Sequence, residues 1–253
     1  MNRGIALGVG AYMIWGVLPI FWKALDTVGS VEILAHRIVW SVVFLGVIIA
    51  IRGSWDEIRG LSPAVTGRLL VAGSLLALNW ATYIWAVNNG HIVESSLGYF
   101  INPLLNVVLG VLILRERLEP MQWLAVGVAA CGVTYMTIGV GSLPWIALVL
   151  ATSFALYALL KKQMRAVGPI ESLTVEVALV LLPALVFLTV LAWSGEGAFW
   201  VAGPRVTVLL ILTGVATALP LLLFGAAAHR IKLSTIGLLQ YIAPSMQFLI
   251  GVF

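Results

Sequence analysis

The stretch YFINPLLN, residues 99–106, carries two asparagines and a proline inside an apolar run that extends from Ser95 to Leu114. A run of that length is typical of a helix that crosses a bilayer, yet amides and a proline are costly in hydrocarbon. A similar stretch, LQYIAPSMQFLIG, occupies residues 239–251. The sequence therefore places a polar, proline-containing segment twice where lipid is the expected surrounding.

Composition identifies the class of protein. Of 253 residues, 62% are hydrophobic and 9% are charged, whereas a soluble domain is nearer half apolar and a quarter charged. We therefore expect an all-α polytopic membrane protein. The single cysteine, Cys131, excludes a disulfide framework and a cysteine metal site. The net charge of +4 is dispersed singly among apolar runs, which is not the pattern of a nucleic-acid-binding protein. No cofactor or metal is expected.

Nine apolar runs are near or above the roughly 18 residues that a spanning helix needs. We expect spans at residues 4–22, 31–51, 69–87, 92–114, 120–139, 143–160, 173–193, 206–228 and 233–253. Eleven of the 14 Lys and Arg then fall on one side of the membrane, namely Arg3, Arg52, Arg59, Arg68, Arg115, Arg117, Lys161, Lys162, Arg165, Arg230 and Lys232. The other side carries Lys23 and Arg205, so the positive-inside rule makes the N-terminus cytoplasmic.

Internal similarity at an offset of 139 residues indicates a duplication. VGSVEIL at residues 28–34 returns as VGPIESL at 167–173, and Pro103 aligns with Pro244 after a two-residue slip. Five spans in each unit would make the second copy enter the membrane upside down, as in many transporters. We therefore predict two inverted five-helix repeats, residues 1–140 and 141–253. The second copy stops inside its fourth span, so this plan places roughly 25–40 further residues and a tenth helix beyond Phe253.

Polar residues within the apolar runs are the candidate substrate site. Pro103 and Pro244 both fall about 16 Å into their spans, near the middle of a roughly 30 Å hydrocarbon layer. Each removes a helical hydrogen bond, so we expect these helix breaks to line a central cavity. Amides in membrane helices also serve simply to join neighbouring helices. The residues predicted to bind a solute are Tyr12, Trp15, Arg37, Asn79, Tyr83, Tyr99, Asn102, Asn106, Gln240 and Tyr241.

Ionisable residues in the second span are candidates for gating or coupling. Glu32 and His36 are one turn apart, and Arg37 lies about 9 Å inside the outer end of the span. A charge at that depth usually faces a partner or an aqueous path. Since the offset relates Arg37 to Glu176, we expect an ion pair between them, either static or broken during transport. Glu32 and His36 could carry a proton or act as structural hydrogen-bonding residues.

Four segments resemble the RarD proteins of the EamA-like branch of the drug/metabolite transporter superfamily: AYMIWGVLPIFWK (11–23), EILAHRIVWS (32–41), NWATYIWAVNNG (79–90) and SSLGYFINPLLNVVLGVLILRERL (95–118). The resemblance covers the whole chain and is strongest in the first half. It implies ten helices in two inverted repeats around a central binding cavity, in the inner membrane of a bacterium.

These patterns predict a secondary transporter that moves a small organic metabolite or drug by alternating access. The chain has no GxxxxGK[ST] motif for ATP hydrolysis. An intramembrane enzyme acting on a lipid-linked substrate is one alternative, although HExxH and GxSxG motifs are absent. A channel is another. The expected partners are membrane lipid and a small-molecule solute, and a homodimer is left open.

Overall fold

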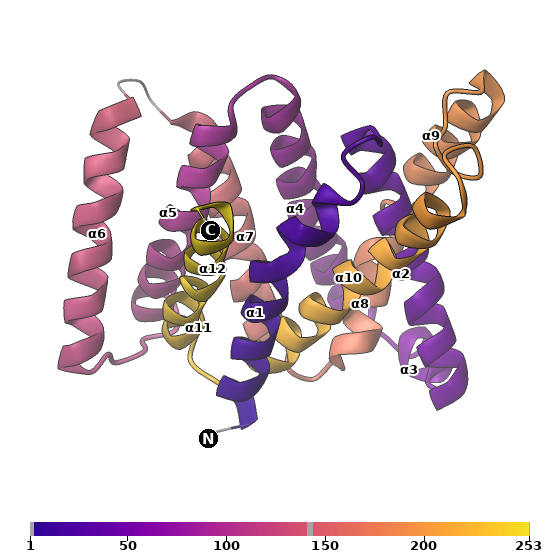
Figure 1. Ribbon diagram of the computed structural model, residues 1–253. Coiled ribbons are helices and arrows are strands. Elements are labelled where there is room, and N and C mark those ends of the chain that lie inside the picture. The colour runs from indigo at the N-terminus through magenta and orange to yellow at the C-terminus, as the bar shows by residue number, and fades with distance from the viewer. Residues whose placement is uncertain (1–2, 141–143, 253) are drawn as a thin grey trace.

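The structure, a computed structural model, describes residues 3–140 and 144–252. Within these ranges every regular element is an α-helix, as the composition predicts. The helices are α1 (Arg3–Lys23), α2 (Ser30–Arg52), α3 (Trp55–Arg59), α4 (Pro63–Asn88), α5 (Ile92–Leu112), α6 (Pro120–Val140), α7 (Trp145–Gln163), α8 (Pro169–Ala178), α9 (Leu181–Ser194), α10 (Pro204–Ala228), α11 (Leu233–Gln240) and α12 (Ile242–Val252). They form one bundle, with α6 at one edge and α9 at the other (Figure 1).

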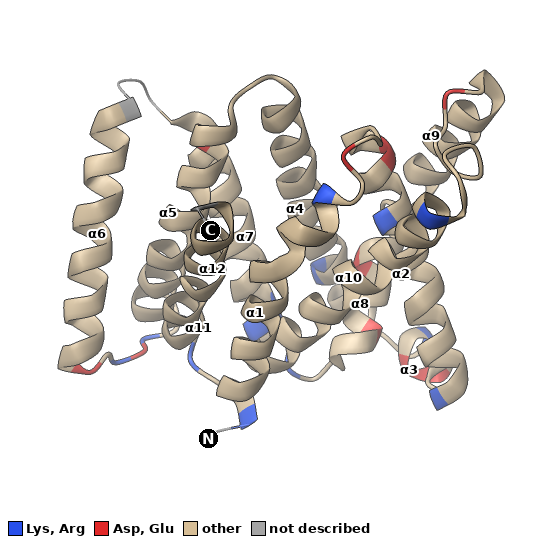
Figure 2. Cartoon of the chain, in the orientation of Figure 1, with Lys and Arg blue, Asp and Glu red and all other residues tan. Residues whose placement is uncertain are grey.

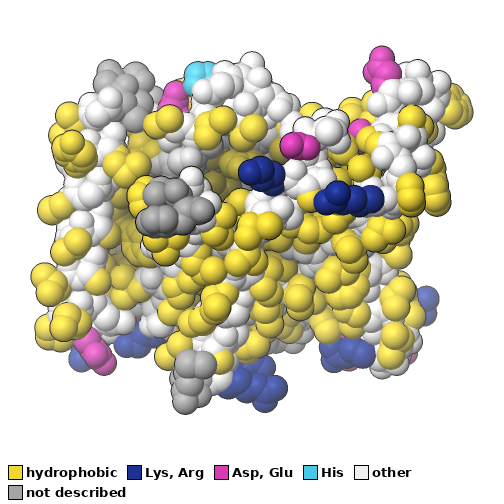
Figure 3. All heavy atoms as spheres, in the orientation of Figure 1, with side chains coloured by type: hydrophobic (Ala, Val, Ile, Leu, Met, Phe, Trp, Pro, Cys, Tyr) yellow, Lys and Arg dark blue, Asp and Glu magenta, His cyan; other side chains and the backbone are white. Residues whose placement is uncertain are grey.

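Helix length and apolarity identify the membrane spans. In the described ranges eight helices are long and apolar enough to cross a bilayer, if α11 and α12 are counted as one. The bent pair α8–α9 brings the number of candidate spans to nine if it is counted as one span. This agrees with the nine predicted spans, although α4 begins at Pro63 rather than residue 69 and the short α3 was not predicted. The predicted start of the sixth span at 143 and end of the ninth at 253 lie outside the described residues. Apolar side chains cover the flanks of the molecule (Figure 3), as expected of a surface that contacts lipid.

Prolines in the first turns of α9 and α12 explain two interruptions of the helical chain. Pro183 is the third residue of α9, and α8 and α9 are bent by 51° relative to each other. Pro244 is the third residue of α12, which Tyr241 separates from α11. A proline fits the first turn of a helix because no N–H is needed there, but it opposes helical continuation on its N-terminal side.

The predicted helix break at Pro103 is wrong, because α5 runs unbroken through this residue. Proline removes the hydrogen bond to the carbonyl of Tyr99, but α7 and α11 pack along α5 and hold it in place. Beside the proline, the hydroxyl of Tyr241 donates to the carbonyl oxygen of Phe100 at 3.2 Å. Membrane helices tolerate proline when neighbouring helices support the backbone in this way.

Two glycines let α4 and α10 approach other helices at backbone distance. A Cβ atom on Gly73 of α4 would lie 2.6 Å from the carbonyl oxygen of Glu176 on α8. A Cβ atom on Gly214 of α10 would lie 2.5 Å from the carbonyl oxygen of Trp40 on α2. Next to that contact, the hydroxyl of Ser41 donates to the carbonyl of Gly214 at 3.1 Å. Both helix crossings therefore depend on a missing side chain, as is common between membrane helices.

Replacing Gly214 with alanine is expected to destabilise the protein by about 1–3 kcal/mol, because the new methyl group overlaps the backbone of α2. The matched control is Gly46→Ala in α2, where an added Cβ meets nothing within 4 Å. That change should be neutral or stabilising by up to about 1 kcal/mol. Denaturation in mixed micelles measures both, and equal stability of the two variants would contradict the close crossing.

Helix α6 lies apart from the rest of the bundle. It packs mainly on α5, and none of its described side chains is buried. Cys131, on this helix, is exposed. Within the described residues, this helix therefore lies outside the core of the bundle.

Charged residues collect at the two ends of the bundle. Figure 2 shows most of the Lys and Arg at the end where the N-terminus lies, around the connections α5–α6, α7–α8 and α10–α11. The long flanks between the ends carry few charges in this view. This distribution separates a basic end from an end with few basic residues.

Candidate functional site

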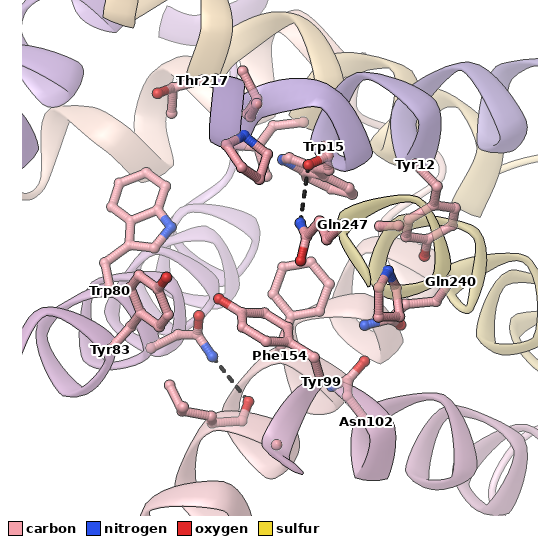
Figure 4. Close-up of a pocket in the computed structure, with 18 of the residues that line it drawn as sticks. Tyr12, Trp15, Trp80, Tyr83, Tyr99, Asn102, Phe154, Thr217, Gln240 and Gln247 are labelled. Carbon is pink, nitrogen blue, oxygen red and sulfur yellow. Dashed lines mark hydrogen bonds between the residues drawn. The ribbon is translucent and has the colours of Figure 1, made fainter. Parts of the chain in front are cut away.

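A cavity of about 220 Å³ lies among eight helices, α1, α2, α4, α5, α7, α10, α11 and α12. Trp80 and Tyr83 of α4 face Tyr12 and Gln240 across it (Figure 4). Eight of the ten residues predicted to bind a solute line it, namely Tyr12, Trp15, Arg37, Asn79, Tyr83, Tyr99, Asn102 and Gln240. Asn106, Tyr241 and Pro103 do not line the cavity, whereas Pro244 does.

The cavity occupies the half of the bundle remote from the N-terminus. On α1, which begins at the N-terminal end, the lining residues run from Tyr12 to Trp22, next to the last residue of the helix. Helices α5 and α7 run in the opposite direction and contribute residues from their first halves, including Gly98 and Phe154. The cavity therefore extends from mid-bundle toward the end that carries few basic residues.

Aromatic rings close the cavity on the N-terminal side; we call this cluster the aromatic floor, formed by Tyr12, Trp15, Phe154, Tyr157 and Phe224. The ring of Phe224 lies at its centre, 5.4 Å from Phe154, 5.9 Å from Trp15, 6.1 Å from Tyr157 and 6.3 Å from Tyr12 between centroids. Phe224 and Tyr157 are completely buried. Rings packed at these distances leave little room for water among them.

The amide side chains around the cavity join helices together. Asn79 donates to the carbonyl of Leu150 at 2.8 Å, and Asn102 donates to that of Ala151 at 2.6 Å. Asn106 donates to Gln240 at 3.1 Å, which links α5 to α11. In this structure these amide N–H groups therefore join neighbouring helices, which was the alternative to solute binding. Their contact with a solute stays a prediction.

Arg37 reaches the cavity from α2. Its Nε donates to the hydroxyl of Thr217 on α10 at 2.9 Å. Its guanidinium carbon lies 5.0 Å from the ring centre of Trp22 and 5.3 Å from that of Trp80, distances typical of cation–π contacts. The side chain is half-buried, and it is one of the residues that line the cavity.

The predicted ion pair between Arg37 and Glu176 is wrong. Glu176 is completely buried and pairs with Lys161 of α7, whose Nζ lies 2.9 Å from its carboxylate. Tyr157 also donates to that carboxylate at 3.0 Å, and Lys161 hydrogen-bonds to Ser172. The offset that relates Arg37 to Glu176 also relates Trp22 to Lys161. Related positions therefore contact each other within each half of the chain, rather than across the two halves.

Glu32 and His36 lie together but do not line the cavity. Their side chains are buried with 3.9 Å between Nε2 of the histidine and the carboxylate. Glu32 accepts a hydrogen bond from the backbone N–H of Ala198 at 2.7 Å, and His36 stacks on Phe199. The pair thus fastens the α9–α10 connection to α2, and its predicted part in coupling or gating stays a prediction.

His229, which follows α10 at the N-terminal end, remains uncharged near neutral pH. Burial, reinforced by the positive charges of Lys161, Arg230 and Arg165, lowers its pKa to about 4.

Among the residues that the structure describes, no three His, Cys, Asp or Glu side chains are grouped so that they could hold a metal ion.

Several lining residues were not predicted from the sequence, namely Trp22, Trp80, Phe154, Thr217 and Gln247. Phe154 follows Trp15 by 139 residues, so the repeat offset could have identified it. Gln247, which donates to the carbonyl of Trp15 at 3.1 Å, stands in the second polar segment quoted above. Thr217 stands in an apolar helix without a distinguishing pattern.

Comparison with known proteins agrees with the resemblance of the four segments. A model of the EamA-like transporter family matches residues 2–138. A protein named RarD from Streptomyces exfoliatus is 49% identical over 99% of this chain and 80% of its own length. An uncharacterized transporter of Vibrio cholerae is 44% identical over 99% of this chain and 83% of its own.

The fold also has a counterpart among solved structures. One crystal structure with 17% identical residues matches 98% of this chain and 87% of its own with a TM-score of 0.75. At that identity the likeness concerns the fold alone. The family model and the sequence matches show that the chain belongs to the EamA-like transporter family.

Proposed function

We propose that this chain is a secondary transporter that moves a small organic solute across the inner membrane of a bacterium by alternating access. The observation that carries the proposal is the cavity among the spans, which extends toward one end of the bundle and is closed toward the other by the aromatic floor. A channel needs a continuous path to both ends, whereas a carrier is closed on at least one side. The cavity volume of about 220 Å³ suits a small organic molecule.

Two inverted repeats are the architecture that we propose for this transporter. The packing supports it, because helices related by the 139-residue offset make equivalent contacts. Helix α1 packs on α10 as α7 packs on α4, and α5 packs on α7 as α12 packs on α1. The carboxylates in the first turns of α2 and α8 also make equivalent contacts. Glu32 of α2 accepts from Ala198, and its counterpart Glu171 of α8 accepts from Ser54. Each of these contacts joins residues 1–140 to residues 141–253, as in transporters whose repeats enclose the site.

We propose a cytoplasmic N-terminus. The basic residues gather at the N-terminal end (Figure 2), and cytoplasmic loops carry an excess of Lys and Arg. In that orientation the cavity extends toward the outside of the cell. The conformation is then outward-facing, and transport requires a second conformation in which the N-terminal end opens.

Contacts at the N-terminal end would have to break for that opening. Glu116, in the α5–α6 connection, accepts hydrogen bonds from the backbone N–H groups of Leu233 at 2.7 Å and Ser234 at 2.9 Å. The hydroxyl of Ser234 donates to the same carboxylate at 2.7 Å. A carboxylate at a helix N-terminus is stabilised by the helix dipole. This Glu116 latch holds the start of α11 against α5.

Replacing Glu116 with alanine is expected to speed amide hydrogen exchange at the start of α11 by about tenfold or more, because a hydrogen bond to a charged group contributes about 1.5–3 kcal/mol. Exchange measured by mass spectrometry on the peptide that contains Leu233 and Ser234 would show it. Glu119→Ala is the matched control, since Glu119 is exposed in the same connection. Equal exchange in the two variants would remove the latch from the mechanism.

Counterflow in liposomes tests the proposed function. Purified protein is reconstituted, the vesicles are loaded with one candidate solute, and uptake of its labelled form is followed. Saturable uptake accelerated by the solute inside indicates a carrier. Flux that rises linearly without saturation indicates a channel, and a chemically altered solute indicates an enzyme; either of these outcomes overturns the proposal.

A further inference from the structure

Among the residues that the structure describes, Arg37 has no anionic partner. No described Asp or Glu lines the cavity. Glu32 and Glu176, which the sequence relates to Arg37, are both engaged elsewhere, Glu32 with the backbone of Ala198 and Glu176 with Lys161. Among the described residues no carboxylate lies within 4.0 Å of the guanidinium. An unpaired charge at this depth in a membrane protein is costly, and typically faces a pathway or a ligand.

The free side of the guanidinium is its terminal edge. Nε is held by the hydroxyl of Thr217, and the rings of Trp22 and Trp80 lie about 5 Å from its carbon. Among the described residues the N–H groups of the two terminal nitrogens have no hydrogen-bond acceptor. Arginine presents these groups as a planar fork that matches the two oxygens of a carboxylate. The contacts of Arg37 therefore orient it while leaving its anion-binding edge unused.

We propose that the cavity binds a solute with one carboxylate, which pairs with the terminal edge of Arg37. This inference rests on the proposed function, and it adds the chemical class of the solute. One carboxylate fits because Arg37 is the only charged residue among the described residues of the lining. A doubly charged phosphate would keep one of its two negative charges without a partner. The hydrogen bonds of such a pair are charge-assisted, and they are stronger than hydrogen bonds between neutral groups.

The rest of the cavity selects the body of this carboxylate. Trp15, Phe154, Tyr83 and Tyr99 line it with aromatic rings, which favour an apolar, preferably flat, group. Tyr12 lines it as well, and its hydroxyl is buried without a hydrogen-bond partner among the described residues. The expected solute is thus a monocarboxylate with an aromatic or similarly flat body.

Matched acid and amide pairs test this inference on the purified full chain in detergent. The probes are phenylacetate with phenylacetamide and indole-3-acetate with indole-3-acetamide, and isothermal titration calorimetry measures their dissociation constants. We expect each acid to bind at least about tenfold more tightly than its amide. In Arg37→Gln the acid should fall to the affinity of the amide, and in Arg37→Lys it should retain part of its advantage, because lysine keeps the charge without the planar fork.

The control is Arg205→Gln, which removes an exposed arginine that does not line the cavity and should leave the acid preference unchanged. Gel filtration and the unfolding temperature without probe verify that each variant is folded. Equal affinity for acid and amide, no binding of either acid, an acid preference that survives in Arg37→Gln, or tighter binding of inorganic phosphate would each overturn the inference. Counterflow of a neutral solute would do so too while leaving the proposed transport function intact.

Discussion

Replacing Glu176 with alanine is expected to lower the free energy of unfolding by about 3–5 kcal/mol, because it leaves the ammonium of Lys161 buried and without its counter-charge. The side chains of this pair are 1% and 0% exposed, and their charged atoms are 2.9 Å apart. Tyr157 would lose its acceptor at the same time. Denaturation of the purified protein in mixed micelles measures the loss.

The matched control removes both charges together. In Lys161→Met with Glu176→Met no charge remains buried, and such replacements are often neutral or stabilising. The double variant should therefore recover most of the stability that Glu176→Ala loses. Asp56→Ala serves as a second control, since Asp56 and Arg59 are largely exposed and such surface pairs contribute little. If the double variant were as unstable as Glu176→Ala, the loss would not come from the unpaired lysine.

Replacing Phe224 with alanine is expected to cost about 3–5 kcal/mol, the usual range for a buried phenylalanine. Its ring is completely buried at the centre of the aromatic floor, and its removal leaves Tyr12, Trp15, Phe154 and Tyr157 without their common contact. The void would adjoin the cavity. We therefore expect the variant to weaken the seal as well as the fold.

Phe224→Leu is the control for volume, and a hydrophobic replacement of similar size should cost less than about 1.5 kcal/mol. In liposomes, Phe224→Ala should also raise the leak of small ions above that of Phe224→Leu, because water can enter the space left below the cavity. If Phe224→Ala were destabilised but leaked ions no faster than Phe224→Leu, Phe224 would be a core residue that does not help to close the cavity.

The spans could be predicted from the sequence because the length and apolarity of a run directly decide whether it can cross a bilayer. Part of the cavity lining could also be predicted, since aromatic and amide side chains such as Tyr99 and Asn102 are conspicuous inside apolar runs. Tyr12 and Trp15 of the aromatic floor were predicted, but its other three residues were harder to recognise. Phe224 looks like any other apolar residue of α10, and only its position among the packed helices distinguishes it.

The partners of the buried charges could not be predicted. Lys161 and Lys162 stand at the end of an apolar run, where lysines ordinarily extend to the membrane surface. In the structure both turn inward, Lys161 to Glu176 and Lys162 to the carbonyl of Ile231. The sequence also does not show which helices cross closely enough for contact. Helix α8 crosses α4 at Gly73, which places Glu176 beside α7 instead of near Arg37.

The exposed position of Cys131 on the outermost helix has a practical consequence for covalent labelling. Cys131 is the twelfth of the 21 residues of α6, which places it at the depth of the acyl chains, where water-soluble maleimides do not enter. Residues 1–253 should therefore react little with such reagents, since they contain no other cysteine. A fluorophore attached to a cysteine introduced at any water-facing position would then report on that position alone, without a cysteine-free background having to be built first.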